Sequence, residues 1–297
     1  MLALSKQAIL NHQKALSKLN LGNQTHMVES QYIHGTSERE QQRLIQQASF
    51  LGVHLDSNLE LHPGERLLEI GCGVGAVLGR IGLSCPEARL YGIDISDEQI
   101  HGARLYLNRL GLHPVELVVG DAAALPWPTG HMDRVRLVWV MEHLQNSRAV
   151  LREAMRVLRP GGTIHITETD YASLRTSPAD ESIEAMLNAF IAHFNRHGNA
   201  HAGPALGPWL EQMGFTNVSV QMESVHHWCL SKRQQMHDFC NYLYEFINPE
   251  REALLESEPN PRRATLIQNG FNRFKTLAAQ ADGSISISFY QARGTKP

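Results

Sequence analysis

The sequence predicts an α/β protein built on a doubly wound sheet, in which parallel strands alternate with helices. Short apolar runs recur between residues 66 and 167, and the segments between them carry apolar residues at helical spacing. Three alternate glycines follow the first run and indicate a tight strand-to-helix turn. Acidic residues stand directly after several runs, where the carboxyl ends of parallel strands share one edge of a sheet.

Composition limits the class of protein. The chain has 297 residues, enough for one large domain or for a domain with an added lobe. Its net charge is -3 and it has no dense block of lysine and arginine, so we expect no nucleic-acid partner. No apolar run is long enough to span a bilayer, and residues 1–21 are polar and amphipathic rather than a signal peptide. We therefore expect a cytoplasmic protein with no membrane partner.

The cysteines and histidines do not indicate a metal. The cysteines lack the spacing of a disulfide framework, which fits reduced thiols in a cytoplasm. One group of histidines and cysteines in the C-terminal third matches no common zinc arrangement, so we expect no metal site. This group consists of His226, His227, Cys229, His237 and Cys240.

Residues 1–60 are expected to form a helical arm ahead of the sheet. Ser37 and Glu40 make a capping box that opens a helix, so Tyr32 lies just before a helix N-terminus. Tyr32 belongs either to an ordinary packed linker or to an arm that folds over a cofactor. In the second case it brings an aromatic ring and a hydroxyl group to the cofactor.

The first strand, Arg66–Ile70, leads into Gly71, Gly73 and Gly75 and then into a helix expected over residues 74–83. Glycines let the backbone come close to a ligand, and the N-terminus of a helix offers unpaired N–H groups. This turn suits a nucleotide-like cofactor, although many such turns use glycine only to change direction.

The second strand, over residues 89–93, is followed by Asp94. Nucleotide-binding folds place an acid against ribose hydroxyl groups about twenty residues after the glycine loop, which is the position of Asp94. Ser96 and Gln99 already supply a capping box for the next helix. Asp94 is therefore expected to be free to bind a ligand.

Three further strands are expected over residues 115–119, 133–138 and 163–167, each followed by polar residues. We expect these residues to meet at the carboxyl edge of the sheet, where ligands of doubly wound proteins bind. The side chains expected at this edge are Asp94, Asp121, Glu142, His143, Glu168 and Asp170.

Five short motifs, in order over residues 63–168, resemble those of the class I S-adenosylmethionine-dependent methyltransferases. They are Glu69-Ile70-Gly71-Cys72-Gly73-Val74-Gly75, Gly92-Ile93-Asp94, Gly120-Asp121, Met132-Asp133 and Leu158-Arg159-Pro160-Gly161-Gly162. The resemblance implies a seven-stranded Rossmann-like core over residues 61–224, with its last strand in residues 283–297. It also implies S-adenosylmethionine as the cofactor and S-adenosylhomocysteine as the product.

The same resemblance implies roles at the adenosine end of the cofactor. Asp94 would bind both ribose hydroxyl groups, and Ile95 would flank the adenine. Asp121 would accept a hydrogen bond from the adenine amino group, and the backbone N–H of Ala122 would meet a ring nitrogen. Carboxylates are suitable acceptors for these hydroxyl and amino donors.

At the methionine end, the resemblance implies that Glu69 and the glycine loop hold the amino acid portion, with the backbone of Val138 beside it. A dinucleotide is the competing ligand, but it favours a Gly-x-Gly-x-x-Gly loop and room for a pyrophosphate. The loop here reads Gly71-x-Gly73-x-Gly75. An acid such as Glu69 near the loop also disfavours a phosphate and favours an ammonium group.

Methyl transfer is a direct displacement in which the enzyme aligns the acceptor atom with the methyl group and often removes a proton from the acceptor. His143 is the first candidate base, because it closely follows the fourth strand and histidine titrates near neutral pH. The alternative is that Glu142 and His143 only cap or pack. Glu168 and Asp170 either orient the acceptor and assist His143 or lie at the surface as ordinary acids.

The sequence favours a small-molecule acceptor, with an O, N or C atom as the methylated position. The Asn/Asp-Pro-Pro-aromatic motif of methyltransferases that act on amines of nucleic acid or on glutamine is absent after the fourth strand. The resemblance includes quinone C-methyltransferases and natural-product methyltransferases. Alternatives are an RNA or protein methyltransferase and a non-catalytic scaffold that retains the cofactor.

Residues 225–282 depart from the family pattern, in which a short hairpin joins the last two strands. This insert between strands six and seven is rich in aromatic residues and in helical periodicity. It is expected to be a lid over the substrate, a contact between copies in a homo-oligomer, or additional core.

Overall fold

The computed structural model describes residues 41, 43–45, 48, 59–112, 114–144, 146–230 and 232–297. Its strands are β1 (Arg66–Ile70), β2 (Arg89–Asp94), β3 (Val115–Val119), β4 (Met132–Val138), β5 (Leu158–Ser177), β6 (Thr216–Trp228) and β7 (Ser284–Thr295). Its α-helices are α3 (Ala76–Ser84), α4 (Asp97–Arg109), α5 (Ser147–Val157), α6 (Glu181–Phe194), α7 (Ala202–Gln212), α8 (Arg233–Ile247), α9 (Arg251–Glu256) and α10 (Pro261–Thr276). Short 3₁₀ turns are η1 (Met141–His143), η2 (Asn248–Glu250) and η3 (Leu277–Ala279).

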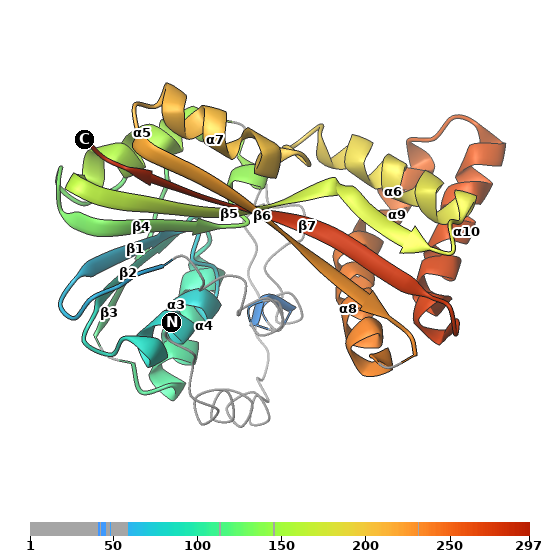
Figure 1. Cartoon of the computed structure of the whole chain (residues 1–297), viewed down its shortest axis with the longest axis horizontal. Coiled ribbons are helices and arrows are strands. Elements are labelled where there is room, and N and C mark those ends of the chain that lie inside the picture. Colours follow the sequence, from blue (N-terminus) through green and yellow to red (C-terminus); the bar gives the residue numbers. More distant parts are fainter. Residues whose placement is uncertain are drawn as a thin grey trace.

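The described strands form one sheet in the order β3-β2-β1-β4-β5-β7-β6. Neighbours among β1 to β5 pair in parallel, whereas β7 runs antiparallel between β5 and β6. In Figure 1, α5 and α7 lie above the sheet, and α3 and α4 lie below it. The predicted doubly wound, seven-stranded fold is confirmed, with an antiparallel strand near one edge.

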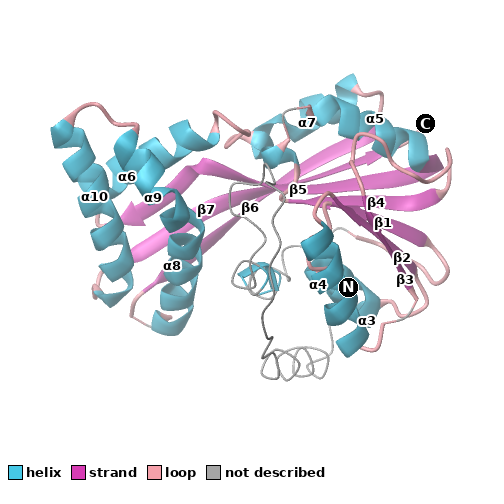
Figure 2. Cartoon of the chain, turned by 180° about the vertical axis from the view of Figure 1, so that it is seen from behind, coloured by secondary structure: helices cyan, strands magenta, loops and turns pink. Residues whose placement is uncertain are grey.

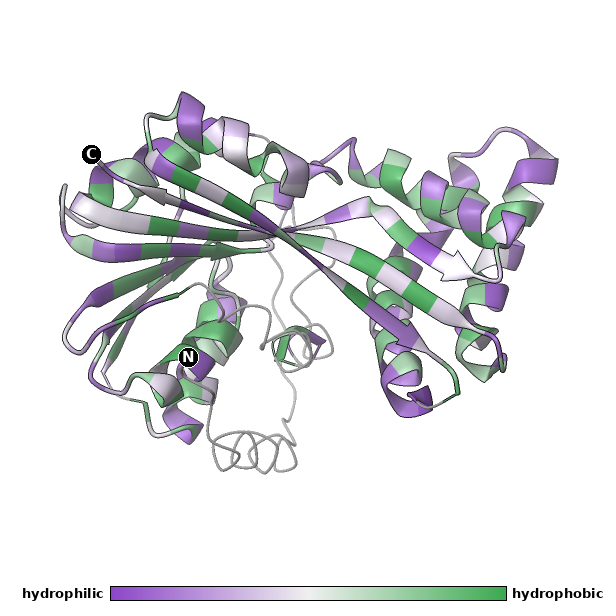
Figure 3. Ribbon diagram, in the orientation of Figure 1, coloured by the Kyte–Doolittle hydropathy of each residue, from purple (hydrophilic) through white to green (hydrophobic). Residues whose placement is uncertain are grey.

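Alternating side chains attach the helices to the two faces of the sheet. Leu68 and Ile70 of β1 pack in the same buried cluster as α5 and α7, whereas Leu67 packs with α3 and α4. Figure 3 shows the same alternation of polar and apolar residues along β5, β6 and β7. Period-two alternation of this kind covers each face with a different set of side chains.

The last three strands are long. β5 has 20 residues where five were expected, and β6 and β7 have 13 and 12 residues. Beyond β4, these strands form a twisted ribbon with α6, α8, α9 and α10 gathered at its far end (Figures 1 and 2). The proposed insert over residues 225–282 thus begins inside β6 and then contains three helices. Within the described residues, no helix is long and apolar enough to cross a membrane.

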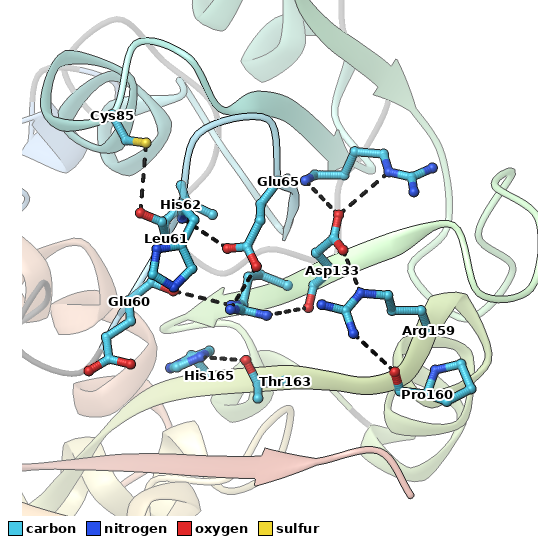
Figure 4. A network of polar contacts seen from close by, with 12 residues as sticks. Glu60, Leu61, His62, Glu65, Cys85, Asp133, Arg159, Pro160, Thr163 and His165 are labelled. Atoms are coloured by element: carbon cyan, nitrogen blue, oxygen red, sulfur yellow. Dashed lines mark hydrogen bonds and ion pairs between the residues drawn. The ribbon is translucent and has the colours of Figure 1, made fainter.

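Charged residues tie together the amino ends of the central strands (Figure 4). Asp133 of β4 accepts a hydrogen bond from the backbone N–H of Arg66 at 2.9 Å and forms an ion pair with Arg159 of β5. Arg134 pairs with Glu65 at 2.8 Å. Asp133 and Arg159 belong to two of the five motifs that resemble the methyltransferase family. These two motifs therefore meet at the end of the sheet opposite the expected site, where they stabilise the strand order.

Asp180 fixes the start of α6. Its carboxylate accepts hydrogen bonds from the backbone N–H groups of Ser182 and Ile183 at 2.9 and 3.2 Å, as an N-cap residue does. It also forms an ion pair with Arg273 of α10, so one side chain both caps a helix and joins two helices.

Replacing Asp180 with alanine is expected to lower the free energy of unfolding by about 1–2 kcal/mol, because a helix cap is lost. Arg273→Ala is the matched control, since it removes only the ion pair, whose guanidinium is largely exposed, and such pairs contribute about 0–1 kcal/mol. Urea unfolding of both variants measures the two effects. Equal losses would contradict a capping role for Asp180.

Candidate functional site

The glycine loop turns tightly between β1 and α3. Gly71, Gly73 and Gly75 have φ angles of 68°, 49° and 70°, a region that L side chains rarely adopt. The N–H groups of Gly71 and Cys72 both donate to the carbonyl oxygen of Ile93, at 2.8 and 3.0 Å. The expected helix over 74–83 begins only at Ala76, because Gly75 still has a left-handed backbone.

Gly71 also lies against the segment that follows β4. A Cβ atom placed on Gly71 would be 2.5 Å from Cγ2 of Val140, which is closer than non-bonded carbon atoms approach. Only glycine allows this contact, because a larger residue would push the two segments apart.

Gly71→Ala is expected to lower the free energy of unfolding by about 1–3 kcal/mol, because alanine is strained in the left-handed backbone conformation of Gly71. The clash of the new Cβ atom with Val140 lowers it further. Adding Val140→Ala should restore the part due to the clash and leave the backbone part. Denaturant unfolding of the single and double variants measures both parts. A double variant no more stable than Gly71→Ala would show that Val140 is not the obstacle.

Asp94 accepts two hydrogen bonds from the backbone, one on each oxygen, and each oxygen keeps a second lone pair for a ligand. Its Oδ2 accepts a hydrogen bond from the N–H of Gly73 at 2.8 Å, and its Oδ1 accepts one from the N–H of Ser96 at 3.0 Å. Ser96 does cap α4, since its hydroxyl accepts from the N–H of Gln99 at 3.2 Å. Asp94 thus fastens the glycine loop to the end of β2, and burial raises its pKa. Beside it, the side chain of Ile95 is 72% exposed.

The end of β3 lies next to the end of β2. The N–H of Gly120 donates to the carbonyl oxygen of Asp94 at 2.9 Å, which brings Asp121 to the same edge. Asp121 is exposed, and its Oδ1 accepts from the N–H of Ala123 at 2.8 Å, so the carboxylate orders its own turn. Ala122 is half-buried within that turn.

Glu69 is buried below the glycine loop. Its carboxyl group accepts a hydrogen bond from the N–H of Leu78 in the first turn of α3, and it lies beside Arg136 of β4. Its Oε2 has no hydrogen-bond donor among the described residues. Burial raises the pKa of Glu69 to about 8, against the smaller opposing effect of Arg136.

This raised pKa makes stability depend on pH. An unfolded glutamate has a pKa of about 4.3, so protonated Glu69 favours the folded state. Its contribution is complete below about pH 4.3 and is lost as the pH rises through the folded value of about 8.

The free energy of unfolding should therefore fall less between pH 5 and pH 9 in Glu69→Gln than in the native chain, because the amide cannot ionise. Unfolding in urea at several pH values measures the slope. Glu87→Gln, at an exposed glutamate, is the control and should leave the slope unchanged. An unchanged slope in Glu69→Gln would contradict the protonated state of Glu69.

The segment after β4 is held in an unusual backbone conformation. Val138 is buried at the end of the strand, and Trp139 has a φ of 54°, which is rare for a tryptophan. The indole N–H of Trp139 donates to the hydroxyl of Thr169 at 2.9 Å, and its backbone N–H donates to the carbonyl oxygen of Thr167 at 2.9 Å. These two bonds to β5 stabilise the turn that leads into η1.

His143 closes η1 at the predicted place. Its Nε2 lies 3.5 Å from Oε1 of Glu142, and its ring lies 5.5 Å from that of Phe194 on α6. Burial and, to a smaller extent, Arg43 lower the pKa of His143 to about 3, so the ring is neutral at physiological pH. A neutral imidazole has a nitrogen lone pair that can accept a proton.

Glu168 and Asp170 point to different surroundings. Oε1 of Glu168 accepts from the N–H groups of Val140 and Met141 at 2.9 and 2.7 Å, so this acid is fully buried and supports η1. Oδ1 of Asp170 lies 3.3 Å from Nδ1 of His201. Among the hydrogen bonds of the described residues, Glu168 and not Asp170 bonds to the segment that leads into His143.

Sequence reasoning missed Tyr171 as a member of this site. Its hydroxyl donates to Oε1 of Glu142 at 3.0 Å, and its ring stacks on Phe246 of α8 at 5.4 Å. Tyr171 reaches Glu142 because the pairing of β5 with β7 shifts between Asp170 and Arg175. A bulge of this kind re-aims a side chain, and no local sequence signal marks it. Tyr32, predicted to face the cofactor, lies outside the described residues.

A separate cavity of about 180 Å³ lies on the face of the sheet, across β4, β5, β7 and β6. Its walls include Arg136, His165, Gln291 and Arg293. None of the predicted site residues that the structure describes lines it. This cavity is on a face of the sheet, whereas the predicted residues meet at the carboxyl edge.

Residues 68–166 match a family model described as a methyltransferase domain. The chain is 40% identical over 127 residues to an uncharacterized 37.1 kDa protein in transposon TN4556 of Streptomyces fradiae, a match covering 42% of this chain and 36% of that protein. It is 35% identical over 125 residues to norajmaline N-methyltransferase of Rauvolfia serpentina, covering 40% of each. The match thus covers less than half the length of these relatives.

Among solved structures, the chain is similar to the [4+2]-cyclase SpnF, with a TM-score of 0.54 and 21% identity over 85% of this chain and 82% of that one. At this identity, the likeness shows the fold alone. The family model and the named relatives go further and agree with the motifs at the strand ends. Residues 68–166 thus form a methyltransferase domain, and its relatives agree with the resemblance to the class I S-adenosylmethionine-dependent family.

Proposed function

We propose that this chain transfers a methyl group from S-adenosylmethionine to an O, N or C atom of a small molecule. The observation that carries the proposal is the meeting of two groups of residues at one sheet edge. The glycine loop with Asp94 and Asp121 forms one group, and η1 with His143 forms the other. The contact of Gly71 with Val140 joins them.

The residues present fit this cofactor. The carboxylates of Asp94 and Asp121 suit ribose hydroxyl and adenine amino donors, and the exposed Ile95 offers an apolar surface to the adenine. The backbone N–H of Ala122 would meet a ring nitrogen. The unpartnered buried oxygen of Glu69 suits an ammonium group near the loop. When bound, the cofactor supplies an electrophilic methyl group.

The remaining residues of the site handle the acceptor. Gly71, Gly73 and Gly75, together with the backbone at Val138, would position the methionine end. His143 is the proposed base, because its neutral ring can accept the proton that the acceptor loses. Glu168 positions His143 by holding η1 in place, and Asp170 orients the surrounding turn through His201.

Support for a small-molecule acceptor comes from the surroundings of His143. The ring of Phe194 lies against His143 and belongs to a cluster of aromatic side chains from β5, α6 and α8: Tyr171, Phe190, Phe194 and Phe246. Arg43 also acts on His143. Phe246 belongs to the proposed insert over 225–282, so we propose that the insert helps to enclose the acceptor. A cytoplasmic location and a homo-oligomer, with the arm of residues 1–60 over the cofactor, complete the proposal.

Titration calorimetry tests the cofactor site. Native chain should bind S-adenosylhomocysteine, and Asp94→Ala should lose roughly hundredfold or more in affinity, because hydrogen bonds to a charged group contribute about 1.5–3 kcal/mol each. Asp97→Ala, at an exposed acid in the same turn region, is the control and should bind as the native chain does. Normal binding by Asp94→Ala would overturn the site map, and binding of NAD alone would favour a dehydrogenase.

His143→Ala should keep cofactor affinity and reduce turnover, because a positioned base contributes roughly 10²–10⁴-fold. Formation of S-adenosylhomocysteine with a panel of phenols, amines and quinols measures turnover. Loss of cofactor binding in His143→Ala would instead assign a structural role to the residue.

A further inference from the structure

Glu142 and Glu168 form a pair of carboxyl groups that are both fully buried. Each uses one oxygen for an ordinary donor. Oε1 of Glu142 accepts from the hydroxyl of Tyr171 at 3.0 Å, and Oε1 of Glu168 accepts from the N–H groups of Val140 and Met141 at 2.9 and 2.7 Å. These bonds fix the orientation of both side chains.

The second oxygen of each group is unusual. Neither Oε2 has a hydrogen-bond donor within the part of the chain that the structure describes. Yet the two carboxyl groups lie within hydrogen-bonding reach of each other. Ionised carboxylates have only acceptor oxygens, so such a bond exists only if one group carries a proton. One proton shared between the two groups supplies the donor of that bond.

Electrostatics disfavours full ionisation of the pair, although Arg43 opposes this effect at Glu142. Two like charges in contact repel strongly in a buried site, and burial penalises each charge separately. Burial raises the pKa of both carboxyl groups, that of Glu142 to about 7. Full protonation is also disfavoured, because two backbone N–H groups stabilise a negative charge on Glu168.

We propose that Glu142 and Glu168 share a single proton at neutral pH and act as one positioning unit that keeps one negative charge beside His143. The role toward His143 depends on the proposed function, whereas the shared proton does not. A charge on this pair stabilises the imidazolium that forms when Nε2 or Nδ1 of His143 is protonated, since Oε1 of Glu142 is 3.5 Å from Nε2.

The fold constrains this unit from three directions. The N–H of Asn199 donates to the carbonyl oxygen of Glu142 at 2.7 Å, and a Cβ atom on Gly198 would lie 2.2 Å from the same oxygen. Tyr171 reaches the pair from the bulge of β5. Within the described part of the chain, the charged or titratable groups that also act on the unit include His143, Arg43 and, through Tyr171, Tyr242 of α8.

Three variants test the shared proton. Glu142→Gln and Glu168→Gln each leave one carboxylate and one amide donor, which reproduces the singly protonated pair. The double variant has two amides and no charge. Infrared difference spectra at pH 7, native chain minus variant, report the protonated carboxyl groups that each variant loses, and Glu69 cancels because it is present in all of them.

A shared proton predicts the loss of one protonated carboxyl group in either single variant and no further loss in the double variant. Loss of two groups in the double variant would mean two independent protons, and no loss in either single variant would mean two ionised groups. Either result overturns the proposal. Circular dichroism confirms that each variant is folded before its spectrum is interpreted.

NMR shifts of the His143 ring between pH 5 and pH 9, in the complex with S-adenosylhomocysteine, test the positioning role. The ring stays neutral in this range and senses the charge on the pair, so the native chain should show a shift as the pair takes up its second proton, and the double variant should not. The same pH dependence in the native chain and the double variant would overturn the link to His143. Failure of the native chain to bind S-adenosylhomocysteine would reject the proposed function and leave the infrared result standing.

Discussion

The contact between Gly71 and Val140 is the constraint on which the site depends. It lets the loop after β1 lie directly on the segment after β4, where a side chain on residue 71 would separate them by a clash. Val140 in turn donates its N–H to Glu168, and Glu168 lies against Glu142. Because Gly71 has no side chain, the glycine loop is connected to the acids near His143 through a short series of contacts.

Much of the first half of the fold can be predicted from local sequence. β1 to β4 and the cap of α4 at Ser96 follow from apolar runs, glycines and a capping box, and each of these signals lies within a few residues of the element it defines. Asp94 shows the limit of the same logic. Because Ser96 takes the capping role, the sequence leaves Asp94 to a ligand, but it gives no sign that the backbone of Gly73 also approaches Asp94 and donates a hydrogen bond to it. That approach is a tertiary contact.

The full length of β5 and the contacts it makes could not be predicted, because the signals that set them are distant in sequence. β5 extends to Ser177 only because β7, more than 100 residues later, pairs with it; Ser177 pairs with Ser284. The bulge that presents Tyr171 arises within that pairing. The polar neighbours of Glu168 in the sequence indicate a surface acid. In the structure it is buried, because its carboxyl group accepts hydrogen bonds from the backbone N–H groups of Val140 and Met141. Periodicity carries no information on either contact.

Fold alone does not decide the chemistry, since a cyclase has the same architecture. The distinction must come from residues at the carboxyl edge, and Tyr171 shows why the added lobe matters there. Its ring stacks on Phe246 of α8 while its hydroxyl bonds to Glu142 at the end of the core sheet. Any shift of α8 relative to the core would therefore disturb the acceptor of that hydroxyl, and with it the charge that His143 experiences. The added lobe and the acids beside His143 are thus coupled through one side chain.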